Sequence, residues 1–338
     1  MDAIVLVGGQ GTRLRPLTAT RHKSLVPLLN RPAIEFLFDW LRRSGFRRAV
    51  LALGQNNDDL AAAYPPGVYD GLELVLVQEH ARLESGGAIR NAVTEAGVEG
   101  RFTVLNGDVF VDFDFAAALR SHERLGADLT LALYEVPDPS SFGVAVVGAE
   151  GLVTGFVEKP PPGQAPGNLV NAGVWIFEPE LVAEIPPGPV RVEETLFPSL
   201  VARRRRVLGY QFQGVWADIG TPARYLALHN ALLADGRNVV DDSASIEAGA
   251  RLNGTAVGAG SVISASASVS GSILWESVAI GAGANVTGSI IADGSVIGAG
   301  ATITGAVIGS GAIIPAGASL PPGTSLEAKA RYHAGDDR

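Results

Sequence analysis

The chain has 338 residues, and its hydrophobic content of 47% is enough for two domains with cores of their own. Cysteine is absent, which excludes disulfides and thiolate metal sites, and a net charge of −9 argues against nucleic acid or an anionic membrane as a partner. A small anionic substrate stays compatible with a locally basic site. The apolar run before the first glycines is too short for a signal peptide or a membrane span, so we expect a cytoplasmic protein.

Residues 1–235 alternate between apolar strands and helical patterns. Helices are expected at 34–41, 88–96 and 222–233, the last closing the domain. Strands are expected at 4–7, 49–53, 72–77, 102–105, 129–133, 144–147, 153–157, 174–177 and 207–212. The alternation predicts an α/β, Rossmann-like domain with a mostly parallel sheet, whose ligands bind at the carboxyl ends of the strands.

From residue 238 the pattern changes to a repeat of 17 residues. Three columns of aliphatic side chains keep this period, with apolar steps of six, six and five residues. The columns are Val240, Val257, Leu274, Ile291, Ile308; Ile246, Ile263, Ile280, Ile297, Ile314; and Leu252, Val269, Val286, Ile303, Leu320. Such steps predict a left-handed parallel β-helix of hexapeptide type over 238–326, about 25 Å long for five coils, followed by a tail at 327–338.

The first strand leads into the glycine-rich stretch "GGQGTRLRPLT". No Lys follows at the spacing of a Walker A loop, and Leu14 stands where the dinucleotide fingerprint G-x-G-x-x-G needs glycine. Glycines still allow the backbone to wrap closely around phosphate, and Arg13 can neutralise its charge. The loop therefore predicts phosphate binding but excludes those two classes.

This stretch, together with "HKSLVPLLNRPAIEF", resembles the nucleoside-diphosphate-sugar pyrophosphorylases, which are sugar-1-phosphate nucleotidyltransferases. The resemblance implies that residues 1–235 are a nucleotidyltransferase catalytic domain. It also implies that Arg13 and Lys23 bind the triphosphate and stabilise departing pyrophosphate, although Ser24 replaces the usual Pro. The resemblance assigns the nucleotide to Gly8, Gly9, Gly11, Thr12, Arg13, Lys23, Leu83, Ser85, Gly86 and Gly87, the last four in "LESGGAIRNA".

Further motifs follow in the order that the family requires. "VLNGDVFVDFDF" and "VWADIGTPARYL" resemble the segments that hold two metal-binding aspartates, which implies that Asp108 and Asp218 bind Mg²⁺. "GFVEKP" resembles the segment in which a Glu binds sugar hydroxyls and a Lys binds the sugar phosphate. The implied sugar-phosphate ligands are Gly143, Glu158, Lys159, Asn171 and Gly173, and the implied catalytic residues are Arg13, Lys23, Asp108, Lys159 and Asp218.

Lysine usage gives a separate argument. Only Lys23, Lys159 and Lys329 are lysines among 26 basic residues, and two of the three fall in phosphate motifs. An ammonium is a compact point charge, whereas a guanidinium is a broad fork. A tight phosphoryl site is therefore expected at Lys23 and at Lys159.

The expected reaction joins a nucleoside triphosphate to a sugar 1-phosphate, giving a nucleotide sugar and pyrophosphate. A C-terminal hexapeptide β-helix with "GTRLRPLT" and "KSLVPL" is most similar to the mannose-1-phosphate guanylyltransferase branch, which implies GTP, mannose 1-phosphate and GDP-mannose. UTP- or dTTP-dependent enzymes, for example for glucose 1-phosphate, are the alternative, as is a regulatory homologue without turnover.

A hexapeptide acyltransferase would need a His on the β-helix, and residues 238–330 contain none. The flat faces of the β-helix and Trp275 suggest a homo-oligomer that associates through this domain. The roles of Gln10, Arg15 and Glu79 stay open.

Overall fold

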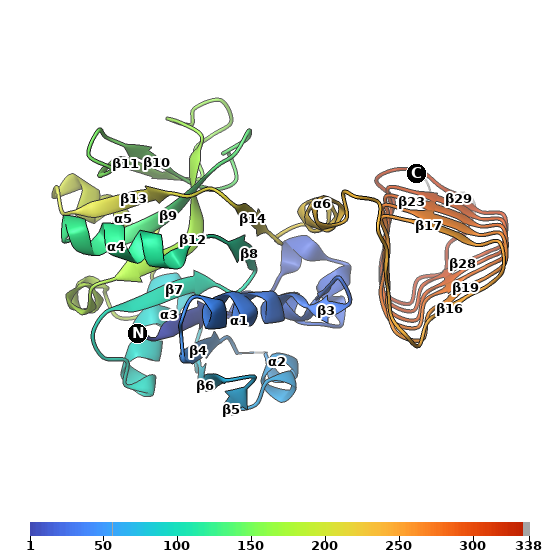
Figure 1. The fold of residues 1–338 in the computed structure, drawn as a ribbon, viewed down its shortest axis with the longest axis horizontal. Helices are drawn as coiled ribbons and strands as arrows, with labels where there is room; N and C mark the ends of the chain where they lie inside the picture. The colour runs from blue at the N-terminus through green and yellow to red at the C-terminus, as the bar shows by residue number, and fades with distance from the viewer. Residues whose placement is uncertain (56, 334–338) are drawn as a thin grey trace. The chain divides into compact units, whose positions relative to one another are not determined.

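The computed structural model describes residues 1–55 and 57–333, and residues 334–338 of the predicted tail lie outside them (Figure 1). The chain divides into two compact units. Unit 1 comprises Met1–Gly9 and Ile34–Trp216, and unit 2 comprises Gln10–Ala33 and the chain from Ala217 onward. None of the helices in the described ranges is long and apolar enough to cross a membrane.

Unit 1 is built on one large sheet, which has ten strands among the described residues. The spatial order is β11-β10-β12-β7-β1-β4-β6-β5, with β9 paired to β12 and β13 paired to β9. The strands are β1 (Ala3–Leu6), β4 (Arg48–Leu53), β5 (Gly67–Tyr69), β6 (Leu72–Gln78), β7 (Phe102–Asn106), β9 (Leu129–Glu135), β10 (Gly143–Val147), β11 (Val153–Glu158), β12 (Leu169–Phe177) and β13 (Val207–Gln211).

The direction of pairing separates this sheet into two halves. β7, β1, β4 and β6 are mutually parallel, and their near-continuous apolar sequences suit strands that are covered on both faces. β12 runs antiparallel to β7, β9 and β10, and β11 runs antiparallel to β10. The predicted α/β, Rossmann-like domain is confirmed, with a sheet more mixed than expected, because β9 to β12 are joined without crossover helices.

Helices connect the parallel strands and pack on the sheet. α3 lies on β1, β4 and β6, and α4 lies on β9 and β13. The Asp114 carboxylate caps the start of α4 by accepting from Ala117 N at 3.0 Å, and Gly126 ends it in the left-handed conformation. The helices of unit 1 are α1 (Ala33–Arg43), α2 (Asp58–Ala63), α3 (Glu84–Ala96), α4 (Phe115–Leu125), α5 (Leu196–Ala202) and the 3₁₀ segment η4 (Pro179–Glu184). The short strand β8 (Val109–Asp112) follows β7, and the chain passes into unit 2 within β14 (Val215–Asp218).

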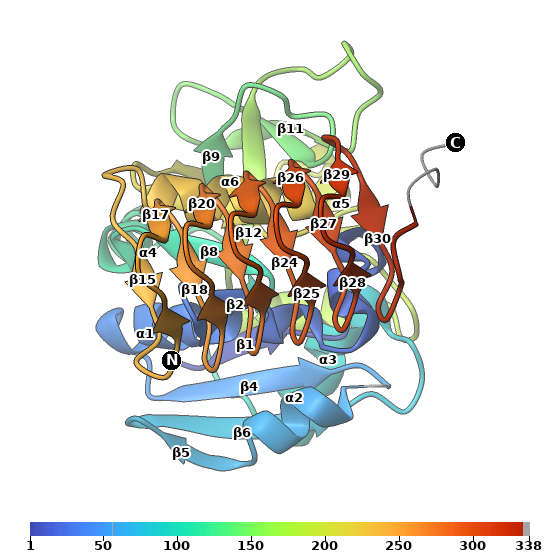
Figure 2. The same cartoon turned by 90° about the vertical axis from the view of Figure 1, so that its right-hand side faces the viewer.

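The C-terminal part of unit 2 is the predicted left-handed β-helix (Figure 2). Its short parallel strands form three sheets in the described part of the chain, and paired residues lie 17 apart, as between Ile263 and Ile280. The sheets contain β15 (Val239–Val240), β18 (Ala256–Val257), β21 (Ile273–Leu274), β24 (Ile290–Ile291), β27 (Val307–Ile308), β30 (Ser325–Leu326); β16 (Ser245–Ile246), β19 (Val262–Ile263), β22 (Ala279–Ile280), β25 (Val296–Ile297), β28 (Ile313–Ile314); and β17 (Arg251–Asn253), β20 (Ser268–Ser270), β23 (Asn285–Thr287), β26 (Thr302–Thr304), β29 (Ser319–Leu320).

The three aliphatic columns form the core of the β-helix. From Val257 to Ile314 their side chains are at most 1% exposed, and burial of each stabilises the stack by about 1.5–3 kcal/mol. The five-residue step is closed by a left-handed glycine and a buried hydroxyl. Ser289, for example, donates to Thr287 O at 2.8 Å and accepts from Ala306 N at 3.1 Å in the next coil. The short corner therefore carries its own hydrogen bonds from coil to coil.

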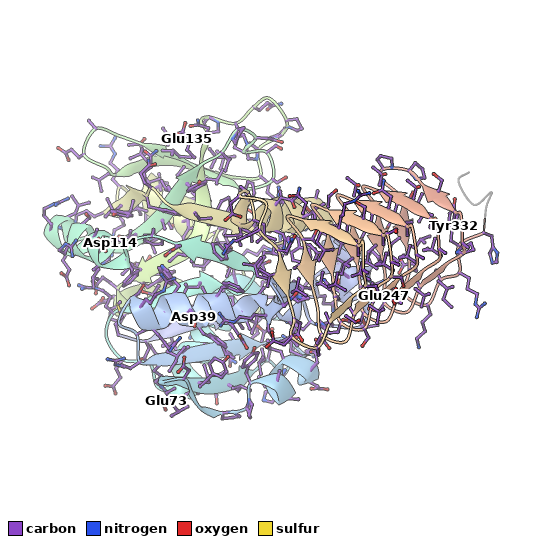
Figure 3. The ribbon with its side chains drawn as sticks, turned by 45° about the vertical axis from the view of Figure 1, so that its right-hand side comes forward. Asp39, Glu73, Asp114, Glu135, Glu247 and Tyr332 are labelled. Atoms are coloured by element: carbon purple, nitrogen blue, oxygen red, sulfur yellow. The ribbon has the colours of Figure 1, made fainter. Side chains whose placement is uncertain are left out.

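The last coil departs from the period of 17. Ile308 pairs with Leu326, 18 residues on, after a turn that begins at Pro321. Residues 327–332, which were expected in the tail, continue along the stack. Arg331 forms an isolated parallel β-bridge with Ile313. Tyr332, at the C-terminal end of the core, is 5% exposed, and its hydroxyl donates to Ser319 O at 3.3 Å (Figure 3).

Unit 2 also contains the segment 10–33 and α6 (Pro222–Leu232). The regular structure of the segment consists of three 3₁₀ turns and one hairpin whose two strands have two residues each: η1 (Thr12–Leu14), η2 (Leu17–Ala19), η3 (Lys23–Leu25), β2 (Pro27–Leu28) and β3 (Arg31–Pro32). Trp275, expected on a self-association surface, is 1% exposed. That prediction is wrong, because Tyr225 of α6 and Arg21 of the segment cover the indole.

Candidate active site

Two neighbouring strand ends carry predicted ligands in unit 1. β1 and β7 are parallel, so their carboxyl ends reach the same edge of the sheet. β1 leads into the exposed Gly8 and Gly9, and β7 leads into a turn made by Gly107 and the half-buried Asp108. The turn lies directly against the first strand, since a Cβ on Gly107 would be 2.3 Å from Val7 Cγ1. The structure therefore brings Gly8, Gly9 and Asp108 to one edge.

Glu79 borders the first glycine turn. It follows β6, is 7% exposed and accepts a hydrogen bond from Leu83 N at 3.2 Å. Burial raises the pKa of the Glu79 carboxyl. A Cβ on Gly8 would lie 3.3 Å from Glu79 Oε1, so there is little space for a side chain there. Glu79 thus links the glycine turn to the half-buried Leu83, a function that the sequence did not reveal.

The first turn of α3 contains the predicted nucleotide ligands Gly86 and Gly87, and both are buried. Gly86 N donates to Val190 O at 2.7 Å, and a Cβ on Gly87 would lie 2.4 Å from Gly188 O. The absence of side chains lets the segment 188–190 pack on the helix. The amide of Gly86 is therefore used within the protein, and its packing role is direct.

A carboxylate that sequence reasoning missed lies beside Ser85. Ser85 Oγ donates to Glu193 Oε2 at 2.5 Å and accepts from Val192 N at 3.1 Å. Burial raises the pKa of the Glu193 carboxyl, and the negative charge of Glu158 adds to this shift. Glu193 is thus close enough to the predicted sugar ligands Glu158 and Lys159 to interact electrostatically with both. The only sequence signal was an acidic doublet before a short helix, which is typical of a solvated helix start.

Glu158 and Lys159 end β11 in a constrained geometry. Glu158 pairs with Gly143 of β10, and a Cβ on Gly143 would lie 2.6 Å from Glu158 Oε2, so this close pairing requires glycine. Lys159 has a left-handed φ of +44°, and its Nζ lies 2.7 Å from Glu158 Oε1. The Lys159 side chain is 53% exposed and that of Glu158 is 17% exposed. The pair offers a reachable cation beside a sheltered carboxylate.

Asn171 organises an irregularity in β12. Its Oδ1 accepts from Gly173 N at 3.1 Å and from Trp175 Nε1 at 2.7 Å, and the pairing of β12 with β9 shifts at this point. Gly173 has a φ of +71°, and a Cβ there would lie 2.6 Å from Asn106 Nδ2. Asn106, which sequence reasoning missed, ends β7 two residues before Asp108. The predicted sugar ligands Asn171 and Gly173 therefore lie beside the turn that carries Asp108.

Unit 2 carries the other predicted phosphate ligands. Gly11 has a φ of +61°, and a Cβ there would lie 3.0 Å from Lys23 Cβ. Thr18 Oγ1 donates to Gly11 O at 2.7 Å, which closes the loop around this contact. Thr12 is exposed. Gly11 and Lys23 are thus neighbours in space, and only glycine suits both the conformation and the close approach.

Asp218 and Arg13 converge on Gly220 within unit 2. A Cβ on Gly220 would lie 2.3 Å from Asp218 Oδ1 and 3.2 Å from Arg13 Nη2. The Asp218 side chain is 16% exposed, and its Oδ2 accepts from Arg224 Nη1 at 3.1 Å. Arg224, in the first turn of α6, was missed because one Arg in a helix usually lies on a solvated face. A carboxylate and a guanidinium therefore share a cradle that glycine keeps open.

The predicted metal ligands Asp108 and Asp218 belong to different units. No group of three or more His, Cys, Asp or Glu side chains in the described ranges could hold a metal ion. Mg²⁺ typically takes one or two carboxylates and completes its octahedron with water and substrate phosphate. The Asp218 carboxylate above Gly220 and the Asp108 carboxylate at a strand end fit that donor chemistry.

Comparisons with known proteins agree with this architecture. A family model described as "Nucleotidyl transferase" matches residues 2–235, and one described as "GlmU-like, C-terminal hexapeptide" matches residues 237–336. A mannose-1-phosphate guanylyltransferase of Mycobacterium tuberculosis is 35% identical over 277 residues, which is 78% of this chain and 76% of that protein.

Two other relatives cover less. The mannose-1-phosphate guanylyltransferase catalytic subunit beta of Drosophila pseudoobscura is 33% identical over 66% of this chain and 60% of that subunit. A UTP–glucose-1-phosphate uridylyltransferase of Synechocystis is 31% identical over 71% of this chain and 65% of that protein. Since a family model covers more than half of its length, the chain is an enzyme that belongs to the nucleotidyl transferase family.

Proposed function

We propose that this protein transfers a guanylyl group from GTP to mannose 1-phosphate, giving GDP-mannose and pyrophosphate. The observation that carries the substrate choice is the 35% identity to a mannose-1-phosphate guanylyltransferase over 78% of the chain, a stretch that must include part of the β-helix. The reaction class is supported by the family and by the predicted phosphate ligands that each unit presents.

The chemistry is an in-line substitution at the α-phosphorus of the triphosphate. An oxygen of the sugar phosphate forms the new P–O bond, and the bond from the α-phosphorus to the bridging oxygen of pyrophosphate breaks. The attacking phosphate is already ionised near neutral pH, so neither a general base nor a covalent nucleophile is required. Catalysis then depends on positioning and on stabilisation of charge.

The residues divide this task by charge. Arg13 and Lys23, at the glycine loop, would neutralise the negative charge that develops on departing pyrophosphate. Lys159, half-exposed beside Glu158, would orient the incoming sugar phosphate while Glu158 accepts hydrogen bonds from sugar hydroxyls. Each cation is presented by backbone in an unusual conformation or at a glycine contact, which favours a defined position over a mobile one.

Asp108 and Asp218 are the proposed ligands of Mg²⁺, which when bound supplies positive charge to the phosphate oxygens. Both are compact oxygen donors beside backbone turns, and Arg224 holds one oxygen of Asp218. Arg224 thus fixes the orientation of that carboxylate. We infer that Asn106 similarly supports the Asp108 turn through its contact with Gly173.

A UTP- or dTTP-dependent enzyme is the second candidate. The Synechocystis relative, named for UTP and glucose 1-phosphate, supports it at 31% identity. Thymidylyl enzymes usually carry Gln where this chain has Ser24, which counts against dTTP.

The test is a panel of GTP, UTP, ATP and dTTP against the 1-phosphates of mannose, glucose and N-acetylated sugars, with pyrophosphate release as the readout. The proposal expects the highest kcat/KM for GTP with mannose 1-phosphate. A preference for UTP with glucose 1-phosphate selects the second candidate. If no pair releases pyrophosphate but a nucleotide sugar binds, the protein is a regulatory homologue.

A further inference from the structure

Trp275 is a bulky side chain at a position where the coils on either side carry Gly and Ala. It follows β21, and the equivalent positions in the two adjacent coils are Gly258 and Ala292. It is 1% exposed, its indole N–H donates to Tyr225 Oη at 3.2 Å, and the Arg21 guanidinium carbon lies 5.1 Å from the ring centre. A guanidinium at that distance over an indole gains a cation–π attraction.

Asp293, in the next coil, forms an ion pair with Arg21. Its Oδ2 accepts from Arg21 Nη2 at 3.1 Å, and its Oδ1 accepts from Glu276 N at 3.2 Å. The side chains of Arg21 and Asp293 are 23% and 27% exposed, so water screens this pair less than a fully exposed one. Arg21 is therefore held between two coils of the β-helix.

Other contacts hold the segment 10–33 on either side of Arg21. Asn30 Nδ2 donates to Val257 O at 2.7 Å, and the Tyr225 hydroxyl donates to Pro27 O. Thr20 Oγ1 lies 3.3 Å from Ser310 Oγ. Val257, Trp275, Asp293 and Ser310 lie in four successive coils. The segment thus crosses the coils and is fixed to each of them.

The segment has little regular structure to hold its own shape. Short 3₁₀ turns and a two-residue hairpin are weak elements, so long-range contacts must supply much of its order. Arg21 is two residues before Lys23, and Lys23 packs against Gly11 at the phosphate loop. Movement at Arg21 would therefore be transmitted to Lys23 and to the loop that contains Arg13.

We propose that the β-helix is a working part of the catalytic apparatus, in which Trp275 and Asp293 are positioning residues for the triphosphate-binding segment. They hold Arg21, and through it they place Lys23 and the loop that carries Arg13. The identity of the ligand rests on the proposed function, whereas the ordering of residues 10–33 by the β-helix does not.

The kinetic test compares full-length Trp275→Ala and Asp293→Asn with wild type, using GTP and mannose 1-phosphate. Each variant is expected to lose about 10–100-fold in kcat/KM for GTP, while KM for mannose 1-phosphate stays unchanged. Trp275→Phe, which keeps an aromatic face under Arg21, should retain most of the activity. The matched control is Asp242→Asn, on an exposed turn of the same domain, which should behave as wild type.

Hydrogen exchange supplies a readout that needs no turnover. In Trp275→Ala and in Asp293→Asn, the amides of residues 10–33 should exchange faster than in wild type, with the circular dichroism spectrum unchanged. Equal exchange in that segment overturns the proposal, as does an Asp293→Asn variant whose GTP kinetics match those of Asp242→Asn. A wild-type protein that never releases pyrophosphate refutes the proposed function, and the exchange data then decide the positioning role alone.

Discussion

Acid should destabilise unit 2 through one buried histidine. His229, on α6, is 0% exposed, and neither ring nitrogen has a hydrogen-bond partner among the described residues. Burial lowers the pKa of His229 from 6.5 to about 4, because a charged imidazolium has no compensation there. The folded protein therefore keeps His229 neutral at pH values where the unfolded chain binds a proton.

The size of the effect follows from these two values. Between pH 7.5 and pH 5 the unfolded state takes up the proton and the folded state does not, so the free energy of unfolding falls as the pH falls. The loss is about 2 kcal/mol at pH 5 and about 3 kcal/mol at pH 4, and its limit at lower pH is about 3.4 kcal/mol, at 1.36 kcal/mol for each unit of pKa difference. Stability from this group is complete above pH 6.5.

The measurement is guanidinium unfolding at a series of pH values, followed by tryptophan fluorescence and circular dichroism. His229→Leu removes the titration and should lose about 2 kcal/mol less than wild type between pH 7.5 and pH 5. His80→Leu, the same change at an exposed histidine, should follow wild type. His122, whose pKa burial also lowers, stays in all three proteins and cancels in the comparison. Parallel losses in wild type and His229→Leu would refute the reasoning.

Three predictions concern the active site. Asp108→Asn should lower kcat at least about 100-fold without unfolding the protein, whereas Asp112→Asn, an exposed Asp four residues later, should not; unchanged turnover removes Asp108 from the mechanism. Lys159→Arg should chiefly impair use of the sugar 1-phosphate, because a broad guanidinium replaces a point charge, and unaltered KM and kcat would contradict the lysine argument. Gly220→Ala would place a Cβ 2.3 Å from Asp218 Oδ1 and should abolish activity while the circular dichroism spectrum persists, so an active variant would show that this cradle is not used.

The β-helix was predicted from the sequence in detail, because its signal is local and repeated. Each inward side chain recurs after one coil, so the period of 17 gave both the register and the buried columns, as at Ile263 and Ile280. The slip at the last coil was not predicted, since a single extra residue near Pro321 has no repeat to reveal it.

The candidate site was predictable where a motif follows a strand directly. The resemblance to the family identified Gly8 and Asp108, and the rule that parallel strands end at a common edge explains why β1 and β7 bring them to one place. Glu193 and Arg224 were not predictable, because their partners Ser85 and Asp218 are identified by packing and not by spacing.

Membership of the segment 10–33 in unit 2 was beyond the sequence as well. Its contacts join residues more than 200 positions apart, such as Asn30 with Val257 and Arg21 with Asp293. Trp275 was likewise predicted to be exposed, because the residues that bury it, Tyr225 and Arg21, are distant in the sequence. Long-range polar contacts produce no repeating pattern in the sequence, so neither periodicity nor composition predicts them.

The fixed repeat of the β-helix restricts how its length can vary. Whole coils of 17 residues can be added or lost without shifting any strand pair, and the one 18-residue step, from Ile308 to Leu326, lies at the C-terminal end of the stack. The segment 10–33, however, contacts coils at fixed positions. The coil of Val257, which Asn30 contacts, and that of Ser310, which Thr20 contacts, are separated by about 14 Å at roughly 4.8 Å per coil. A coil inserted between those two would prevent Asn30 and Thr20 from making both contacts at once. Coils can therefore be added only at the C-terminal end of this domain, beyond the coils that the segment 10–33 contacts.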